Sequence, residues 1–394
     1  MIKNILLIAS VLTTLLAQSE SDFQTKQRED FEKEKTKFNL YKKTQEDEFK
    51  SYQEAQAKTY SEYIKEISEH WDDPKMSTKK SWVSYTKDKK TRTNVDFEKK
   101  TIVLETIASS KKEAKKRLQN ALANVVTIDT KRVQESDPLE QKLAKIKRPK
   151  SIITSEVKAE PILSTLIFDK EPTKNNLISY VNRETENSKI KSHKSNRLKN
   201  KRVYSLNISM PKDATIKRSK IYYKEVKKQA KRQNLPISLV FAIMHSESSF
   251  NPRARSHVPA YGLMQIVPRT AGIDSYQYLY NKRRVVSSSY LYNSKNNITM
   301  GSAYLHLLYY KYLKDVKDPD SRLYCTIAAY NTGAGNVAWA FTRTNNMRKA
   351  APIINSMSST EVYNRLMSDL KYDEPKHYLG RVSKRVGLYY KLYG

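Results

Sequence analysis

Glu247 is the side chain in this sequence best placed to carry acid–base chemistry. It follows the apolar run of residues 237–244, and its spacing from Val240, Ile243 and Met244 puts all four on one helical face. A carboxyl group at the end of a buried stripe is partly desolvated, which raises its pKa and keeps a proton available near neutral pH. Taken alone, this stretch also fits a glutamate at a frayed helix end that is fully hydrated.

Two later stretches have the residue types that a sugar-binding groove requires. The first is residues 260–271, which include Gly262-Leu263-Met264-Gln265. The second is residues 328–337, in which Tyr330-Asn331 is followed by two glycines. An aromatic ring offers a flat face to a pyranose, and an amide offers fixed donors to hydroxyl and acetamido groups. Taken separately, each stretch also fits a core segment followed by a turn.

Together and in this order, these stretches resemble the catalytic domain of the soluble lytic transglycosylase family, which has a goose-lysozyme-like fold. The matching blocks are Glu247-Ser248-Ser249-Phe250, residues 262–271, residues 328–333 and Tyr378-Leu379-Gly380-Arg381-Val382, with Asn297, Ile298 and Gly301 between the second and third. Four blocks in the family's order argue against a chance match. One departure is Pro259-Ala260, where many relatives have Gly-Ala.

The resemblance implies cleavage of the β-1,4 bond between N-acetylmuramic acid and N-acetylglucosamine in peptidoglycan, without net hydrolysis. Glycosidases usually need two carboxylates, and Glu247 is the one available in the matched blocks. Glu247 would therefore protonate the departing oxygen and then take the proton of the muramoyl C6 hydroxyl, which closes on C1 to form a 1,6-anhydro end. Intramolecular attack can replace an activated water because its effective molarity is large.

The same matching implies substrate-binding roles for six further residues, and no metal or cofactor. They are Ser248, Met264, Gln265, Tyr330, Asn331 and Tyr378. The alternative for these six is packing around the catalytic helix. His245 lies two positions from Glu247 and points elsewhere on the helix, so we expect a structural role. Cys325, the only cysteine, is expected to be a buried small hydrophobe.

The elements that position these residues are predicted to form an all-α catalytic domain over residues 215–394. Helical periodicity indicates segments 219–233, 236–249, 297–315, 320–331, 348–355, 359–369 and 375–390. All eight glycines lie beyond residue 261, which excludes a glycine-rich phosphate loop from the first two-thirds of the chain. The single cysteine excludes an intramolecular disulfide and any multi-cysteine metal site.

Residues 20–71 are predicted to form one long helix with an aromatic stripe. Aromatic residues recur every eleven positions: Phe38, Phe49, Tyr60 and Trp71, and likewise Tyr41, Tyr52 and Tyr63. Eleven residues nearly complete three helical turns, so the stripe barely drifts around the axis. We expect it to pair with another helix or to pack on its own domain, because a single exposed helix would leave the rings in water.

Residues 72–210 are predicted to form a small α+β domain. Strand-like segments are 82–85, 93–97, 101–107 and 203–208, with a helix over 110–126 and a basic linker over 188–201. Around residues 60–215 the chain resembles, more loosely, the N-terminal domain of the membrane-bound lytic murein transglycosylase C family. The expected fold class is therefore α+β: a long helix and a small mixed domain before an all-α, goose-lysozyme-like domain.

The apolar N-terminus indicates where the protein is located, and the net charge indicates what kind of partner it binds. Residues 1–17 fit a signal peptide and are too short to span a bilayer, although an uncleaved anchor is the alternative. No cysteine stands at the cleavage site, so a bacterial lipid anchor is not expected. The net charge is +32, with the excess beyond residue 70, which favours a polyanionic partner as much as it fits a generally lysine-rich composition.

The expected location is the periplasm, with peripheral outer-membrane association as a further option, and the expected partner is the peptidoglycan glycan strand. A hydrolytic muramidase is the alternative enzyme. A non-catalytic peptidoglycan-binding protein is another class, against which the intact Glu247 and Tyr378 argue. A cytoplasmic nucleic-acid binder would explain the charge, but neither the apolar leader nor the groove blocks, so no nucleic-acid partner is expected.

Overall fold

A computed structural model describes residues 2–168, 171–186 and 189–394, with side chains 2–25, 30, 38, 41, 42 and 45 outside the described residues. The chain divides into two compact units. One comprises residues 1–59 and 146–151, and the other comprises 60–145 and 152–394. The second unit contains both the mixed region and the all-helical region, so the candidate site lies within one unit.

The first unit consists mainly of helix α1 (Ile2–Ser68), whose last turns belong to the second unit. The side chains of the predicted leader, 1–17, lie outside the described residues, as do Phe38 and Tyr41 of the aromatic stripe. Phe31 and Leu40 are 63% and 65% exposed. Among the side chains that are described, none of the helices is both long and apolar enough to cross a bilayer.

The C-terminal end of the stripe belongs to the second unit and is packed there. Tyr63, Ile67 and Trp71 are buried against Val83 and Tyr85 of the sheet. The helix ends at Ser68 rather than at the expected residue 71, and the indole nitrogen of Trp71 donates to Lys89 O at 2.6 Å. Packing on its own domain is therefore confirmed for this end of the helix.

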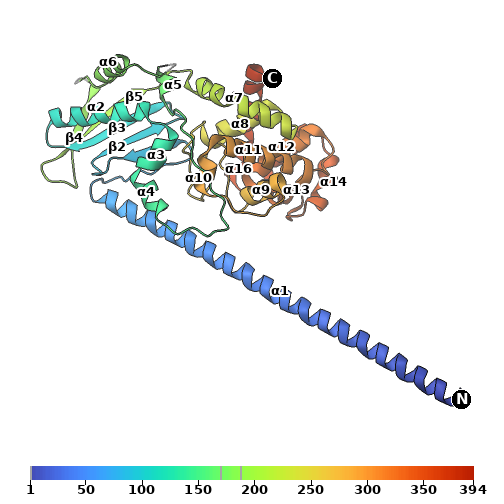
Figure 1. Ribbon diagram of the computed structural model, residues 1–394. Coiled ribbons are helices and arrows are strands. Elements are labelled where there is room, and N and C mark those ends of the chain that lie inside the picture. Colours follow the sequence, from blue (N-terminus) through green and yellow to red (C-terminus); the bar gives the residue numbers. More distant parts are fainter. Residues whose placement is uncertain (1, 169–170, 187–188) are drawn as a thin grey trace. The chain divides into compact units, whose positions relative to one another are not determined.

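The mixed region is built on a five-stranded antiparallel sheet of order β1-β2-β3-β5-β4 (Figure 1). The strands are β1 (Ser81–Tyr85), β2 (Thr91–Asp96), β3 (Thr101–Ala108), β4 (Lys191–Lys194) and β5 (Arg202–Ser209). Alternation in β3 sends Ile102 and Leu104 toward helix α2 (Lys111–Thr127), while Ile107 faces the end of α1.

The predicted linker 188–201 contains an edge strand, which the sequence did not indicate. All four side chains of β4 are exposed, so the segment shows no alternation of apolar and polar residues. Its backbone pairs with β5, from Lys191 opposite Ser205 to Lys194 opposite Arg202. The described part of 129–190 contains four short helices: α3 (Thr130–Ser136), α4 (Pro138–Ala144), α5 (Ser164–Ile167) and α6 (Lys174–Glu184).

The all-helical region surrounds one helix, α8 (Ile237–Ser248), ten of whose twelve side chains are buried. The other elements are α7 (Ala214–Gln233), α9 (Ala271–Tyr280), α10 (Ser288–Tyr292), α11 (Ser294–His306), η2 (Leu307–Tyr312), α12 (Pro319–Thr332), α13 (Ala334–Thr342), α14 (Met347–Asn355), α15 (Ser359–Asp369) and α16 (Asp373–Tyr393). The predicted helix 297–315 is interrupted, because its second half winds as the π-helix η2. The expected fold class, α+β followed by an all-α domain, is confirmed.

Candidate active site

Glu247 lies in the last turn of α8 and is only 5% exposed. The helix stops because Ser249 and Phe250 adopt left-handed backbone angles, with φ of 50° and 61°. Burial raises the pKa of the Glu247 carboxyl, and the charge of Lys79, the hydroxyl of Tyr378 and the charge of Lys80 oppose that rise. The alternative of a frayed and hydrated helix end is therefore wrong.

Helix α16 packs along α8 and brings Tyr378 beside the carboxyl. Tyr378 is 2% exposed, and its hydroxyl has no hydrogen-bond partner of ordinary geometry within the described part of the chain. Burial and the charge of Glu247 hold the pKa of Tyr378 well above its usual value, so this hydroxyl stays protonated as a donor.

The segment after α8 is fixed to it by Ser248. The Ser248 hydroxyl is fully buried and donates to Leu263 O at 2.7 Å, with Met244 O at 3.1 Å. The amide of Met264 donates to Asn297 Oδ1 at 2.7 Å, and its side chain is also fully buried. Ser248 and Met264 thus hold the loop in place, and neither side chain is exposed.

Gln265 and Asn331 each use one end of their amide within the chain. Gln265 adopts a φ of 50° and donates from Nε2 to Gly262 O at 3.0 Å. Asn331 donates from Nδ2 to Glu374 Oε1 at 3.1 Å. The other end of each amide, Gln265 Oε1 and Asn331 Oδ1, is buried without a hydrogen-bond partner in the described residues.

Tyr330 ties helix α12 to the same loop, because its hydroxyl donates to Met264 O at 2.8 Å. Burial and then the charge of Glu247 raise its pKa far above the usual value, which places this ring near the carboxyl. The structure therefore places the rings of Tyr330 and Tyr378 beside the buried carboxyl of Glu247. Native proteins rarely leave buried polar atoms unpaired, so the unpartnered oxygens of Gln265 and Asn331 call for an explanation.

Two lysines before strand β1 also belong to this site, and sequence reasoning missed them. Lys80 Nζ donates to His245 O and Ser246 O, both at 2.8 Å, and to Ser249 Oγ at 3.1 Å. The last carbonyls of a helix have no partner within it and carry partial negative charge. Lys80 therefore caps the C-terminal end of the helix that carries Glu247.

The lysines are linked to acidic groups on either side. Lys79 Nζ lies 3.9 Å from Glu374 Oε1, the atom that also binds Asn331, and Lys80 Nζ lies 3.8 Å from Glu98 Oε1. Burial lowers the pKa of Lys80 to about 8, partly offset by Glu98. Contacts that join positions so far apart in sequence leave no periodic signal, which is why the sequence did not reveal them.

The two reactive side chains expected to be structural lie in packed surroundings. The His245 ring stacks on Phe250 with centroids 5.7 Å apart, and Tyr389 Oη lies 3.1 Å from its Nδ1. Burial and the charge of Arg385 lower the pKa of His245 to about 3, so it stays neutral. Cys325 is buried on α12, and burial raises the pKa of its thiol to about 12.

Comparisons with known proteins match two parts of the chain to family models. Residues 224–353 match the family model of the transglycosylase SLT domain, and residues 41–221 match that of the N-terminal domain of membrane-bound lytic murein transglycosylase C. The chain is 33% identical over 310 residues to the membrane-bound lytic murein transglycosylase C of Klebsiella pneumoniae subsp. pneumoniae, covering 77% of this chain and 80% of the relative. For the protein of the same name from Cronobacter sakazakii, the identity is 32% over 316 residues, and the match covers 79% of this chain and 82% of the relative.

Among solved structures, the 70 kDa soluble lytic transglycosylase from Escherichia coli is 24% identical, with a TM-score of 0.34. The match covers 44% of this chain and 24% of that one.

Proposed function

This chain belongs to the membrane-bound lytic murein transglycosylase C family, and from that premise we propose that it cleaves peptidoglycan glycan strands with Glu247 as both acid and base. The observation that carries the proposal is the buried Glu247 carboxyl, which has a raised pKa and lies beside the hydroxyl of Tyr378. A raised pKa lets a carboxyl group keep its proton to a higher pH, which suits general acid catalysis.

The first step is cleavage of the bond to the leaving sugar. Protonated Glu247 donates its proton to the glycosidic oxygen between N-acetylmuramic acid and N-acetylglucosamine while the bond from that oxygen to C1 breaks. Positive charge develops at C1 of the muramoyl residue, and the carboxylate left on Glu247 is the nearby anion. We propose that polar groups of the substrate form hydrogen bonds with three side chains. These are the unpartnered oxygens of Gln265 and Asn331 and the hydroxyl of Tyr378.

The second step closes the muramoyl ring on itself. The C6 hydroxyl attacks C1, and the Glu247 carboxylate takes the hydroxyl proton, which restores the acid for the next cycle. The product carries a 1,6-anhydro end, and no water is consumed. Ser248, Met264 and Tyr330 support this chemistry by fixing the loop 261–266 against α8 and α12.

Mass analysis of the products tests this mechanism directly. Purified sacculi are digested with the full chain, and the released muropeptides are weighed. The expected products are anhydro-muropeptides, each lighter by one water than the hydrolytic product. Products that contain the added water would identify a hydrolytic muramidase instead, and absence of soluble products under conditions where the protein sediments with sacculi would identify a non-catalytic binding protein.

The location proposed is the periplasm, reached through cleavage of the leader within residues 1–17. The basic composition beyond residue 70 supports contact with an anionic envelope polymer. Fractionation of expressing cells, with determination of the mature N-terminus, tests the export. Sedimentation of the Glu247→Gln full chain with sacculi at low and high salt tests the contact, which we expect to weaken as salt screens the charges.

A further inference from the structure

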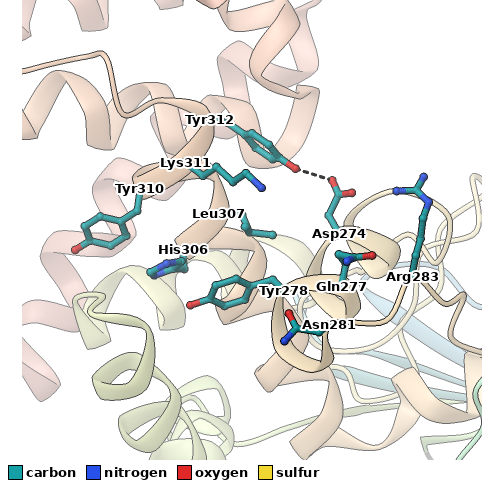
Figure 2. Close-up of a pocket in the computed structure, with 10 residues that line it drawn as sticks. All are labelled: Asp274, Gln277, Tyr278, Asn281, Arg283, His306, Leu307, Tyr310, Lys311 and Tyr312. Carbon is teal, nitrogen blue, oxygen red and sulfur yellow. Dashed lines mark hydrogen bonds between the residues drawn. The ribbon is translucent and has the colours of Figure 1, made fainter. Parts of the chain in front are cut away.

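A pocket lies on the all-helical region, between helix α9 and the π-helix η2 (Figure 2). Its volume is about 530 Å³, within the range of small-molecule sites. None of the residues that line it belongs to the candidate active site.

The pocket is far from Glu247 along the catalytic helix. Its aromatic wall is anchored to Gln233 and Asn234, which precede the N-terminal end of α8. Glu247 lies near the opposite end of this twelve-residue helix, which is about 18 Å long. A ligand in this pocket would therefore be separate from the reacting bond.

One side of the pocket is a rigid aromatic wall. The rings of Tyr278 and His306 stack with centroids 4.9 Å apart, and His306 is 4.8 Å from Tyr310 (Figure 2). The Tyr278 hydroxyl donates to Gln233 Oε1 at 3.1 Å, and the Tyr310 hydroxyl donates to Asn234 O at 2.8 Å. Tyr278 nevertheless remains 40% exposed, so part of a preorganised ring is open to a ligand.

The other side carries charge (Figure 2). Asp274 accepts a hydrogen bond from the Tyr312 hydroxyl at 3.1 Å. Lys311 and Arg283 line the same pocket, and among the described residues neither has an ion pair or a hydrogen bond. Two free cations against one engaged carboxylate give the pocket a net attraction for an anionic group.

The π-helix η2 supplies several of the residues that line the pocket. Three consecutive residues of η2, Tyr310, Lys311 and Tyr312, all line the pocket. The wider turn is a geometry often found at functional sites, and here it carries a ring, a cation and a second ring in consecutive positions.

We infer that this pocket binds a muramyl unit of a glycan strand, a carboxylate-bearing N-acetylated sugar, as a second saccharide site. The open part of Tyr278 offers an apolar face to the pyranose ring. The amides of Gln277 and Asn281, which also line the pocket, suit the acetamido group and hydroxyls. Lys311 and Arg283 suit the carboxylate. The choice of ligand rests on the proposed function, whereas the existence of the pocket does not.

Calorimetric titration of the Glu247→Gln full chain tests the site without cleavage of the probe. The probe is a soluble tetrasaccharide of alternating N-acetylglucosamine and N-acetylmuramic acid, and the comparison probe is a tetrasaccharide of N-acetylglucosamine alone, which lacks carboxylates. We expect two binding events with the first probe, and at least tenfold weaker binding at the second site with the comparison probe.

Two variants locate the second event. Lys311→Gln, and Lys311→Gln combined with Tyr278→Ala, are expected to weaken that event at least tenfold. The control is Lys391→Gln combined with Tyr390→Ala, which changes the same residue types at two exposed positions of α16. The single variant changes one unpaired side chain, so it also tests the site if the double variant fails to fold.

A single binding event in the parent, or a second event that neither variant changes, would overturn the inference. Failure of this second site can be distinguished from failure of the proposed cleavage mechanism. If wild-type protein releases no anhydro-muropeptides but the second event is present and sensitive to Lys311→Gln, the proposed chemistry fails and this site stands. If anhydro products appear but one event is seen, the site fails alone.

Discussion

The all-helical region and the sheet region contribute to the candidate site in different ways. Every residue proposed to contact the reacting sugar lies between α8 and α16, whereas the sheet region supplies Lys79 and Lys80. The residues from the helical region lie in short sequence motifs, and each motif can be recognised from neighbouring positions alone. The lysines act on the end of α8 from more than a hundred and sixty positions away. The chemistry of the acid is therefore set locally, but its position depends on a second domain.

Two buried arginines contribute to the contacts between the two regions. Arg253 Nη2 lies 2.5 Å from Glu140 Oε1, and its Nη1 donates to Gln134 at 3.0 Å. Arg218 of α7, fully buried, donates across the regions from Nη1 to Ile162 O at 2.5 Å, and within the helical region from Nε to Phe250 O at 2.8 Å. Buried charged contacts are intolerant of the loss of one partner, so they fix the geometry between the regions.

The largest effect is expected for Glu247→Gln, which tests the helical side of the comparison. Release of anhydro-muropeptides should fall by at least 10²–10⁴-fold, because amide nitrogen neither donates an acidic proton nor accepts one back. Muropeptide release from sacculi measures it, with exposed Glu186→Gln as the matched control. Activity of Glu247→Gln equal to that of the control would remove the acid from the mechanism.

Arg253→Ala tests whether the buried pair holds the two regions together. Loss of one partner should lower the free energy of unfolding by about 3–5 kcal/mol, because Glu140 would keep an uncompensated charge. Urea unfolding measures this value. Lys131→Ala breaks an exposed ion pair with Glu135 and should cost under about 1 kcal/mol. Equal losses in the two variants would mean that the buried pair has no special role.

Gly301→Ala tests how tightly the loop is packed within the helical region. A Cβ atom at this position would clash with Met264 Sδ and with Met264 Cβ, so the loop must shift. Overpacking of this kind costs about 1–3 kcal/mol, and activity should fall with it. Gly387→Ala is the matched control, since nothing lies within 4 Å of its added atom. If Gly301→Ala and Gly387→Ala had the same free energy of unfolding and the same activity, the loop would have moved to accept the added methyl group without cost.

Lys80→Ala tests the contribution of the sheet region to catalysis. Its removal leaves two carbonyls of α8 uncapped, and we expect turnover to fall by roughly tenfold, the equivalent of one charge-assisted hydrogen bond. Lys80→Arg should restore part of the activity, and Lys111→Ala, an exposed lysine of α2, serves as the control.

The pH profile separates positioning from a general loss of stability. The charge of Lys80 favours ionised Glu247, so removal of that charge should raise the pKa of Glu247 further. The decline of activity on the alkaline side should then move to higher pH. An unshifted profile with unchanged turnover would show that the sheet region does not position the acid.

The sequence predicted the parts of the site that local spacing determines. The i, i+3, i+4 and i+7 positions of α8 indicated that Glu247 is buried, and the structure confirms it. Spacing could not show that Ser248 faces the loop carbonyls rather than open space, because that depends on where residues 261–266 return. Nor could it reveal η2, since the apolar period continues unbroken from α11 into the wider turn.

The most direct test of the central claim is a titration of the Glu247 carboxyl. Carbon-13 signals of labelled glutamates in the full chain are followed against pH, and the Glu247 signal is identified by its absence from Glu247→Gln. We predict a midpoint above 4.5, the ordinary value, because burial disfavours the charged form. A midpoint at or below 4.5 would contradict the account, since burial would then not favour the protonated form of the proposed acid.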